Sequence, residues 1–201
     1  MDYRSIYERI CSTVETRAYL TPAQAVDSRQ RTEMQRIQQQ IQASNFEPDA
    51  VRSAIHEAYR DGRIDRVLML SALHVVACHP SVADWSEAAR LVGEQELAAL
   101  DQGGSRLQDN LASVERHRGV LAFLRGHYEV ALDYFARALE RQRSSENLQN
   151  ILCTLIRLGD EEDARALLTQ IRGAFPSHLV EEINHLIALD PDLALLREES
   201  P

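Results

Sequence analysis

Apolar residues along the chain recur at intervals of three and four, the spacing that places them on one face of an α-helix. Near the amino terminus, Ile6, Ile10 and Val14 form one such stripe. Farther along, the pattern recurs around a central glycine in the segments FLRGHYEVALDYFARAL and LIRLGDEEDARALLTQI. Helix-favouring Ala, Leu, Arg, Gln and Glu fill the stretches between a few Pro and Gly residues. The pattern predicts an all-α protein.

Four glycines divide the chain at nearly equal intervals. Gly62, Gly93, Gly126 and Gly159 lie 31, 33 and 33 residues apart, and a small or apolar residue stands four positions before and five positions after each of them. Such residues let two antiparallel helices cross closely on either side of a tight turn. We therefore expect each of these glycines to lie in the turn of a helical hairpin.

This arrangement resembles the tetratricopeptide repeat family, whose unit of about 34 residues is a helix, a tight turn and a second helix. The resemblance covers roughly residues 48–178 and is clearest in the last two units. It implies a short right-handed α-solenoid with an N-terminal helical extension. The matching positions of these two units are Gly126, Tyr128, Ala131, Phe135 and Ala138, followed by Gly159, Ala164, Leu168 and Pro176.

The match weakens toward the amino terminus. In the second unit Trp85 and Ala89 suit the family's pattern. Gly103 and Gly104 then end its second helix early, because glycine readily takes the left-handed conformation at a helix end. The sequence leaves open whether residues 82–111 form a regular helix pair. An irregular helical bundle with coincidental glycine spacing is the alternative for the whole chain.

The pattern divides the chain into three parts. Residues 1–44 form an N-terminal helical cap or arm, residues 45–178 the repeats, and residues 179–201 a C-terminal capping helix and tail. A cap would cover the apolar end of the first repeat. Alternatively, the narrow apolar stripe of the Gln-rich run MQRIQQQIQAS, after a helix start at Thr21-Pro22, makes an arm that pairs with a second copy or a partner.

Composition and charge narrow the classes of function. A net charge of −9 does not favour attraction to nucleic acid or to an anionic membrane surface. The start MDYRSIYERI and the longest apolar stretch, residues 67–78, do not suit a signal peptide or a membrane span. Cys11, Cys78 and Cys153 are far apart, which favours a reducing cytoplasm. All 22 basic residues are arginine, a bias typical of a GC-rich bacterial genome.

Candidate chemistry is sparse. The sequence has no glycine-rich phosphate loop, GxSxG elbow, HExxH motif or CxxC pair. His74, Cys78 and His79 suggest a metal site, since residues i and i+4 share a helix face, but a third ligand would have to come from another helix. Buried cysteine without a ligand role is common. We therefore predict no enzymatic activity, no cofactor and no metal.

In the family that the chain resembles, first helices line a concave groove that binds a peptide or helix of a partner. Within such a groove Arg52, Arg90 and Arg116 would form a basic row suited to an acidic peptide. The alternatives are that each arginine is solvated or paired within the chain, and that Tyr59 and Phe123 pack between repeats. The repeat phase assigns to the groove Arg52, His56, Tyr59, Glu87, Arg90, Arg116, Val120, Phe123, Gln149 and Cys153.

Together these observations favour a cytoplasmic protein–protein interaction module, an adaptor, scaffold or client chaperone. In its architecture the chain is similar to small bacterial chaperones of the tetratricopeptide class. We expect its partner to be another protein, with a homodimer through the N-terminal helices as a further option. The alternatives are a helical enzyme with an unrecognised site and, against the net charge, an RNA-binding helical-repeat protein.

Overall fold

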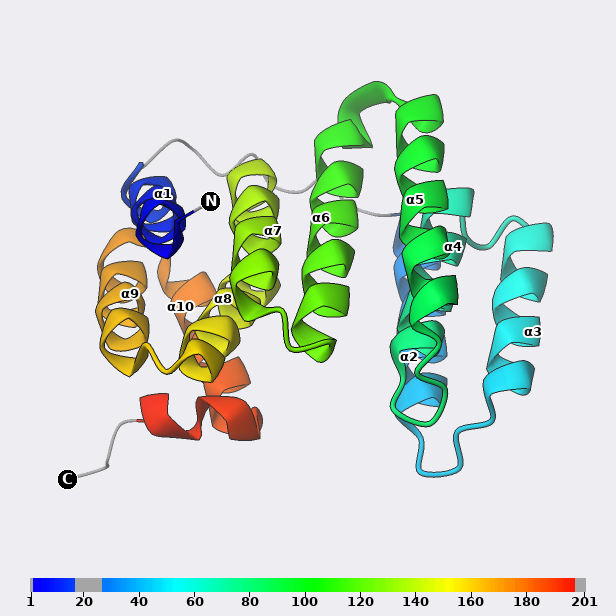
Figure 1. Cartoon of the computed structure of the whole chain (residues 1–201). Coiled ribbons are helices and arrows are strands. Elements are labelled where there is room, and N and C mark those ends of the chain that lie inside the picture. The colour runs from blue at the N-terminus through cyan, green and yellow to red at the C-terminus, as the bar shows by residue number, and fades with distance from the viewer. Residues whose placement is uncertain (1, 17–26, 198–201) are drawn as a thin grey trace. The chain divides into compact units, whose positions relative to one another are not determined.

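A computed structural model describes residues 2–16 and 27–197. All regular secondary structure in these residues is helical, which confirms the all-α prediction (Figure 1). Consecutive helices pack as neighbours in several pairs, whereas a solenoid of repeats stays a prediction. The helices are α1 (Tyr3–Glu15), α2 (Ser28–Gln42), α3 (Pro48–Arg60), α4 (Arg66–Cys78), α5 (Trp85–Gln102), η1 (Gly104–Arg106), α6 (Leu107–Leu124), α7 (Tyr128–Arg141), α8 (Ser145–Leu158), α9 (Glu161–Ala174), α10 (Ser177–Leu189) and η2 (Pro191–Leu196), where η marks a 3-10 helix.

Packing divides the chain into two units. The middle unit, residues 21–121, holds α2 to α5, η1 and most of α6. The terminal unit combines residues 1–20 with residues 122–201, and it holds α1, α7 to α10 and η2. Within the middle unit α4 packs against α2, α3 and α5. This explains why α4 is apolar nearly all round, with buried Val67, Leu70, Ala72, Leu73, His74, Val76, Ala77 and Cys78.

Three of the four predicted glycines lie in turns, and the helices flanking two of them, Gly62 and Gly159, pack as predicted for a hairpin. Gly62, Gly126 and Gly159 lie between consecutive helices with φ of 69°, 77° and 87°. A side chain at such φ is strained, so glycine suits these positions. The local signal for these turns was therefore sufficient without tertiary information.

The fourth predicted turn is wrong, because Gly93 lies inside α5. Good helix formers such as Leu91 and Gln95 flank Gly93, and the apolar face continues past it to Ala98 and Ala99, which are buried. One interior glycine costs a helix only about 1 kcal/mol, and burial of this face outweighs it. The helix ends instead at Gly103, whose φ is 54°, as the sequence predicted. Residues 85–102 are thus one long helix.

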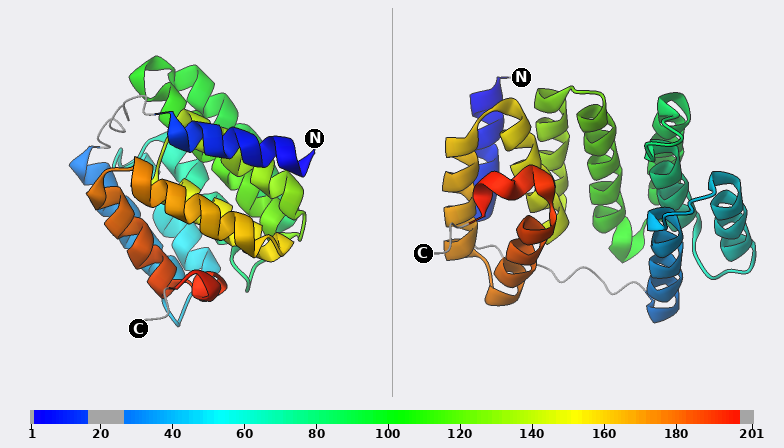
Figure 2. Two further views of the ribbon diagram at one scale, coloured as in Figure 1. Left: turned by 90° about the vertical axis from the view of Figure 1, so that its left-hand side faces the viewer. Right: turned by 90° about the horizontal axis from the view of Figure 1, so that it is seen from below.

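The N-terminal residues 1–44, expected to act as one part, contribute helices to both units. Helix α1 packs against α7 and α9 of the terminal unit, whereas α2 packs against α3 and α4 of the middle unit (Figures 1 and 2). An apolar stripe predicts that a helix has a buried face, but it does not predict which other helices pack against that face. The predicted helix start at 21–22 lies outside the described residues, and α2 begins at Ser28 with Asp27 as its cap.

Candidate partner-binding surface

The ten predicted groove residues divide between the two units. Within each unit the structure brings only some of them into contact. Seven belong to the middle unit, namely Arg52, His56, Tyr59, Glu87, Arg90, Arg116 and Val120, and three to the terminal unit, namely Phe123, Gln149 and Cys153.

In the middle unit an ion pair joins two of the predicted residues on separate helices. Arg52 of α3 places its Nη2 atom 2.9 Å from Oε2 of Glu87 on α5, and each side chain is about a quarter exposed. The backbone N–H of Glu87 also donates to the side chain of Asp84, which caps α5. The ion pair thus reaches from α3 to the first turn of α5, while α4 packs against both helices.

The predicted basic row is largely neutralised by neighbouring carboxylates. Arg52 lies 3.5 Å from Asp49 as well as beside Glu87. Arg90 pairs with Glu94 and lies 3.9 Å from Glu87. The alternative of pairing within the chain therefore holds for these two arginines. Arg116 lies on α6 and is half-buried.

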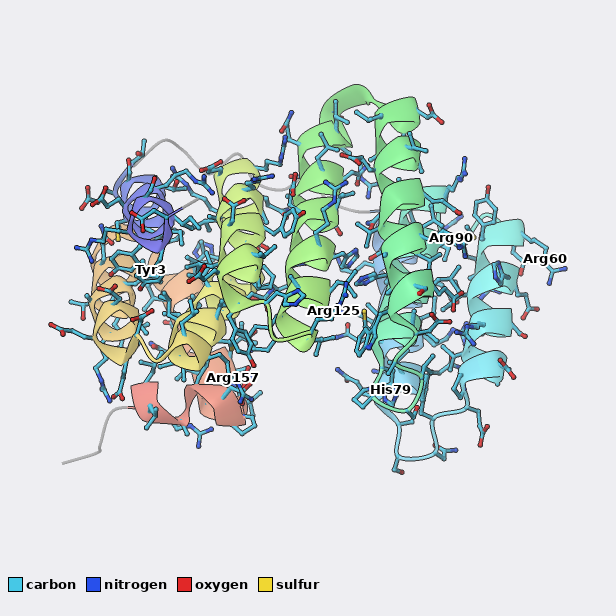
Figure 3. The ribbon with its side chains drawn as sticks, in the orientation of Figure 1. Tyr3, Arg60, His79, Arg90, Arg125 and Arg157 are labelled. Atoms are coloured by element: carbon cyan, nitrogen blue, oxygen red, sulfur yellow. The ribbon has the colours of Figure 1, made fainter. Side chains whose placement is uncertain are left out.

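The exposed part of this surface follows one face of α3. Arg52, His56 and Tyr59 are spaced at i, i+4 and i+7, so they share that face. His56 is exposed, and Tyr59 is exposed to 41%. In Figure 3, Arg90 projects from α5 on the side toward α3, whereas Arg60 projects from α3 away from α5.

In the terminal unit the predicted residues of α8 already contact the chain's own C-terminal segment. Gln149 donates to Oδ2 of Asp190 at 2.8 Å, and the Cys153 thiol approaches the same oxygen at 3.4 Å. One turn farther along the same helix face, Arg157 pairs with Asp192 at 2.7 Å, beside η2 (Figure 3). Burial, and then the Asp190 carboxylate, raise the pKa of the Cys153 thiol, which stays protonated and donates.

Sequence reasoning missed this contact, although the sequence contains a signal for it. Residues 149, 153 and 157 are hydrogen-bond donors spaced by four, and the segment Asp190-Pro191-Asp192 supplies acceptors. The remaining terminal-unit residue, Phe123, is half-buried and meets Tyr128 edge-on at 5.3 Å between ring centroids. Phe123 therefore has a packing role.

A buried polar cluster in the middle unit was also missed as a whole. The rings of His74 on α4 and His117 on α6 stack with centroids 4.4 Å apart, and both residues are nearly inaccessible to solvent. His117 Nδ1 lies 2.8 Å from Gln95 Oε1, and its Nε2 lies 3.4 Å from Ser71 Oγ. His74 Nε2 lies 3.5 Å from Cys78 Sγ, while its Nδ1 has no partner.

Electrostatics keep this cluster neutral at physiological pH. Burial lowers the pKa of His74 to about 4. The pKa of His117 lies well below its usual value, because of burial first and then of nearby His74 and Arg116. Burial raises the pKa of the Cys78 thiol to about 11. Both rings and the thiol are therefore uncharged near pH 7.

The suggested metal ligands do not converge. Within residues 2–16 and 27–197 no three His, Cys, Asp or Glu side chains are placed to hold a metal ion. His79 instead contacts Ser81 at 2.8 Å and packs on the Phe46 ring. Stacked imidazoles such as His74 and His117 direct their nitrogen lone pairs side by side rather than to one point, which disfavours a shared metal.

A surface hollow of about 530 Å³ lies beside the turn between α3 and α4. At its wall, Glu33 pairs with Arg36 at 2.6 Å and with Arg63 at 2.9 Å, and these contacts, that with Arg36 first, lower the pKa of its carboxyl. Arg63 also pairs with Asp61 at 3.0 Å. Glu33, Arg36, Asp61 and Arg63 are therefore paired with one another, and none of these four side chains is left unpaired for a ligand.

Across the described part of the chain, the observations define an all-helical protein with helices packed in neighbouring pairs. Comparison with known proteins finds no matching family model, no matching curated protein and no matching solved structure. The likeness to the tetratricopeptide repeat therefore rests on the residue pattern. No described helix is long and apolar enough to cross a membrane.

Proposed function

We propose that the protein is a protein-binding module of the tetratricopeptide kind, an adaptor, scaffold or client chaperone, and that α3 and α5 together bind a peptide or helix of a partner. The observation that carries the proposal is the ion pair between Arg52 and Glu87 at 2.9 Å. It holds predicted binding positions of two separate helices beside each other. His56 and Tyr59 extend the surface along α3.

The charges on this surface favour a partner of mixed charge. Arg52, Glu87, Arg90 and Glu94 supply guanidinium and carboxylate groups in alternation. A uniformly acidic peptide would have to displace the two glutamates from their arginines, whereas a helix with both signs can pair with all four groups. The exposed ring of Tyr59 adds an apolar contact of the kind enriched at interfaces.

The chemistry of the cysteines supports a cytoplasmic location. Cys11, Cys78 and Cys153 are all free thiols. Reduced thiols are the usual state in the cytoplasm, where disulfides are rare.

Site-specific photo-crosslinking in a living host tests this surface. Tyr59 is replaced by benzoyl-phenylalanine, and captured proteins are identified by mass spectrometry. The matched control carries the same probe at the neighbouring Arg60, which projects away from α5 (Figure 3). We expect a protein captured from position 59 and not from position 60.

Charge reversal adds a second arm to this experiment. Arg52→Glu with Arg90→Glu should reduce the capture at position 59 by about tenfold or more, because the surface loses both guanidinium groups and becomes uniformly acidic beside Glu87 and Glu94. Arg60→Glu should leave the capture unchanged. Equal capture by the double variant and the parent, with helical circular dichroism preserved in both, would exclude the α3–α5 surface.

A further inference from the structure

Helix α1 joins the terminal unit through one apolar face. Ile6, Ile10 and Val14 are nearly inaccessible to solvent, and Tyr7 is buried beside them. Spacing of four residues aligns the three aliphatic side chains along one face of the helix. This face packs against both α7 and α9, each of which also packs against α8 (Figures 1 and 2).

Polar contacts with α9 extend along the whole of α1. The Tyr3 hydroxyl donates to Oδ2 of Asp163 at 2.7 Å, and the Tyr7 hydroxyl donates to the backbone oxygen of the same residue at 3.0 Å. At the other end of α1, Gln170 donates to Oε1 of Glu15 at 2.8 Å. The first and last residues of the helix are therefore both held.

Polar contacts with α7 centre on one arginine. Arg9 places Nη2 at 2.8 Å from Asp133 and Nε at 2.7 Å from Glu140. Together with Asp163 of α9, these carboxylates make an acidic rim around the apolar surface. Helix α1 meets this surface with apolar residues every four positions, flanked by the guanidinium of Arg9 and by two tyrosine hydroxyls.

The contacts of α1 do not depend on its being a sequence neighbour of this surface. The next helix, α2, starts at residue 28 and belongs to the middle unit, and α7 starts only at residue 128. Each hydrogen bond and ion pair described above uses a side chain of α1, α7 or α9. An identical α1 from another copy can make the same contacts, which is the basis of element exchange between protomers.

We propose that the α7–α9 surface is a helix-binding site, and that α1 of a second copy can occupy it in place of the chain's own α1. Two copies would then exchange α1 reciprocally and form a dimer. Charge complementarity fixes the register of the exchanged helix, because Arg9 must meet Asp133 and Glu140. The proposal is independent of the α3–α5 surface.

A pair of charge-altered chains tests the exchange. One chain carries Arg9→Glu, so that its own α1 is repelled by Asp133 and Glu140. The other carries Asp133→Asn and Glu140→Arg, so that its own Arg9 faces an introduced positive charge. Asn is chosen at 133 because Asp133 also contacts Arg137 of α7. In a mixture, each α1 matches the surface of the other chain.

We expect each chain alone to be monomeric at 22.8 kDa, and the equimolar mixture to contain a species of twice that mass by size exclusion with light scattering. A control chain with all three substitutions restores the match within one molecule and should elute as the wild type does. Circular dichroism checks that every chain keeps its helices.

A peptide titration tests whether the α7–α9 surface binds a helix, independently of whether a second copy supplies that helix. The probe is residues 1–16, with and without Arg9→Glu, titrated against the full chain that carries Asp133→Asn and Glu140→Arg. The altered peptide should bind about tenfold or more tightly than the natural one. If the peptides are distinguished but the mixture stays monomeric, the second copy is the wrong occupant. If neither effect is seen, the α7–α9 surface is not a helix-binding site. Loss of helices in an altered chain, with no peptide binding, would also contradict exchange.

Discussion

Two glycines of the middle unit should respond oppositely to the same substitution. Gly93 is inside α5, and a Cβ atom added there meets no atom within 4 Å apart from the neighbouring backbone of its own helix. Gly93→Ala should therefore stabilise the unit by about 1 kcal/mol, the difference in helix propensity. At Gly62 a Cβ also has open space, but φ is 69°. Gly62→Ala should cost about 1 kcal/mol, because left-handed strain of about 1–2 kcal/mol exceeds the gain from a less flexible unfolded chain.

Urea unfolding followed by tryptophan fluorescence measures both changes in the same unit. Trp85, the only tryptophan in the chain, begins α5 and so reports on the middle unit. With a urea dependence of about 1–3 kcal/mol/M, each substitution shifts the midpoint by roughly 0.5 M, in opposite directions. Destabilisation by Gly93→Ala would show that residue 93 lies in a turn, as the glycine spacing alone predicted.

Three further predictions concern the buried and paired side chains. In the folded protein His74 has a pKa of about 4, below the unfolded value of 6.5, so its contribution to the free energy of unfolding is complete above pH 6.5 and is lost as pH falls. From pH 7 to 5 the middle unit should lose roughly 2 kcal/mol more than a His74→Leu variant does, measured by Trp85 fluorescence. Equal losses would refute the burial of a neutral His74. Asp190→Ala, in a Cys11→Ser background, should speed labelling of Cys153 by a thiol reagent about tenfold or more. The slow reaction of Cys78 is the internal reference. An unchanged rate would mean that Asp190 does not help to cover the Cys153 thiol. Arg52→Glu should lower thermal stability by no more than about 1 kcal/mol, since its ion pair is partly exposed, and a much larger loss would assign Arg52 to the core.

The sequence was most informative where structure depends on a few neighbouring residues. The stripe of Ile6, Ile10 and Val14 predicted a helix with one buried face, and the structure contains it. Gly62 and Gly159 marked turns because their positive φ is a local requirement. Gly93 carried the same signal, yet the buried face of α5 that runs through it decided the outcome.

The candidate site was harder to foresee. Repeat spacing indicated that Arg52 and Glu87 would share a surface, and they form an ion pair. The same spacing assigned Gln149 and Cys153 to a partner, whereas both contact Asp190 of the chain itself. The sequence does not show whether a hydrogen-bond donor on one helix meets an acceptor on another protein or on a later segment of the same chain.

The amino-acid sequence by itself determined that the chain is helical, three of the four glycine turns and the absence of familiar catalytic motifs, because helix periodicity and glycine conformation act over a few residues. Only the tertiary structure decided that α1 covers α7 and α9, and that His74 stacks on His117. Those contacts join residues far apart in the chain. The hydrophobic effect is non-directional, so apolar surfaces of similar size and pattern gain similar free energy on burial. Which of them pack together therefore depends on the shape and charge of the whole folded unit.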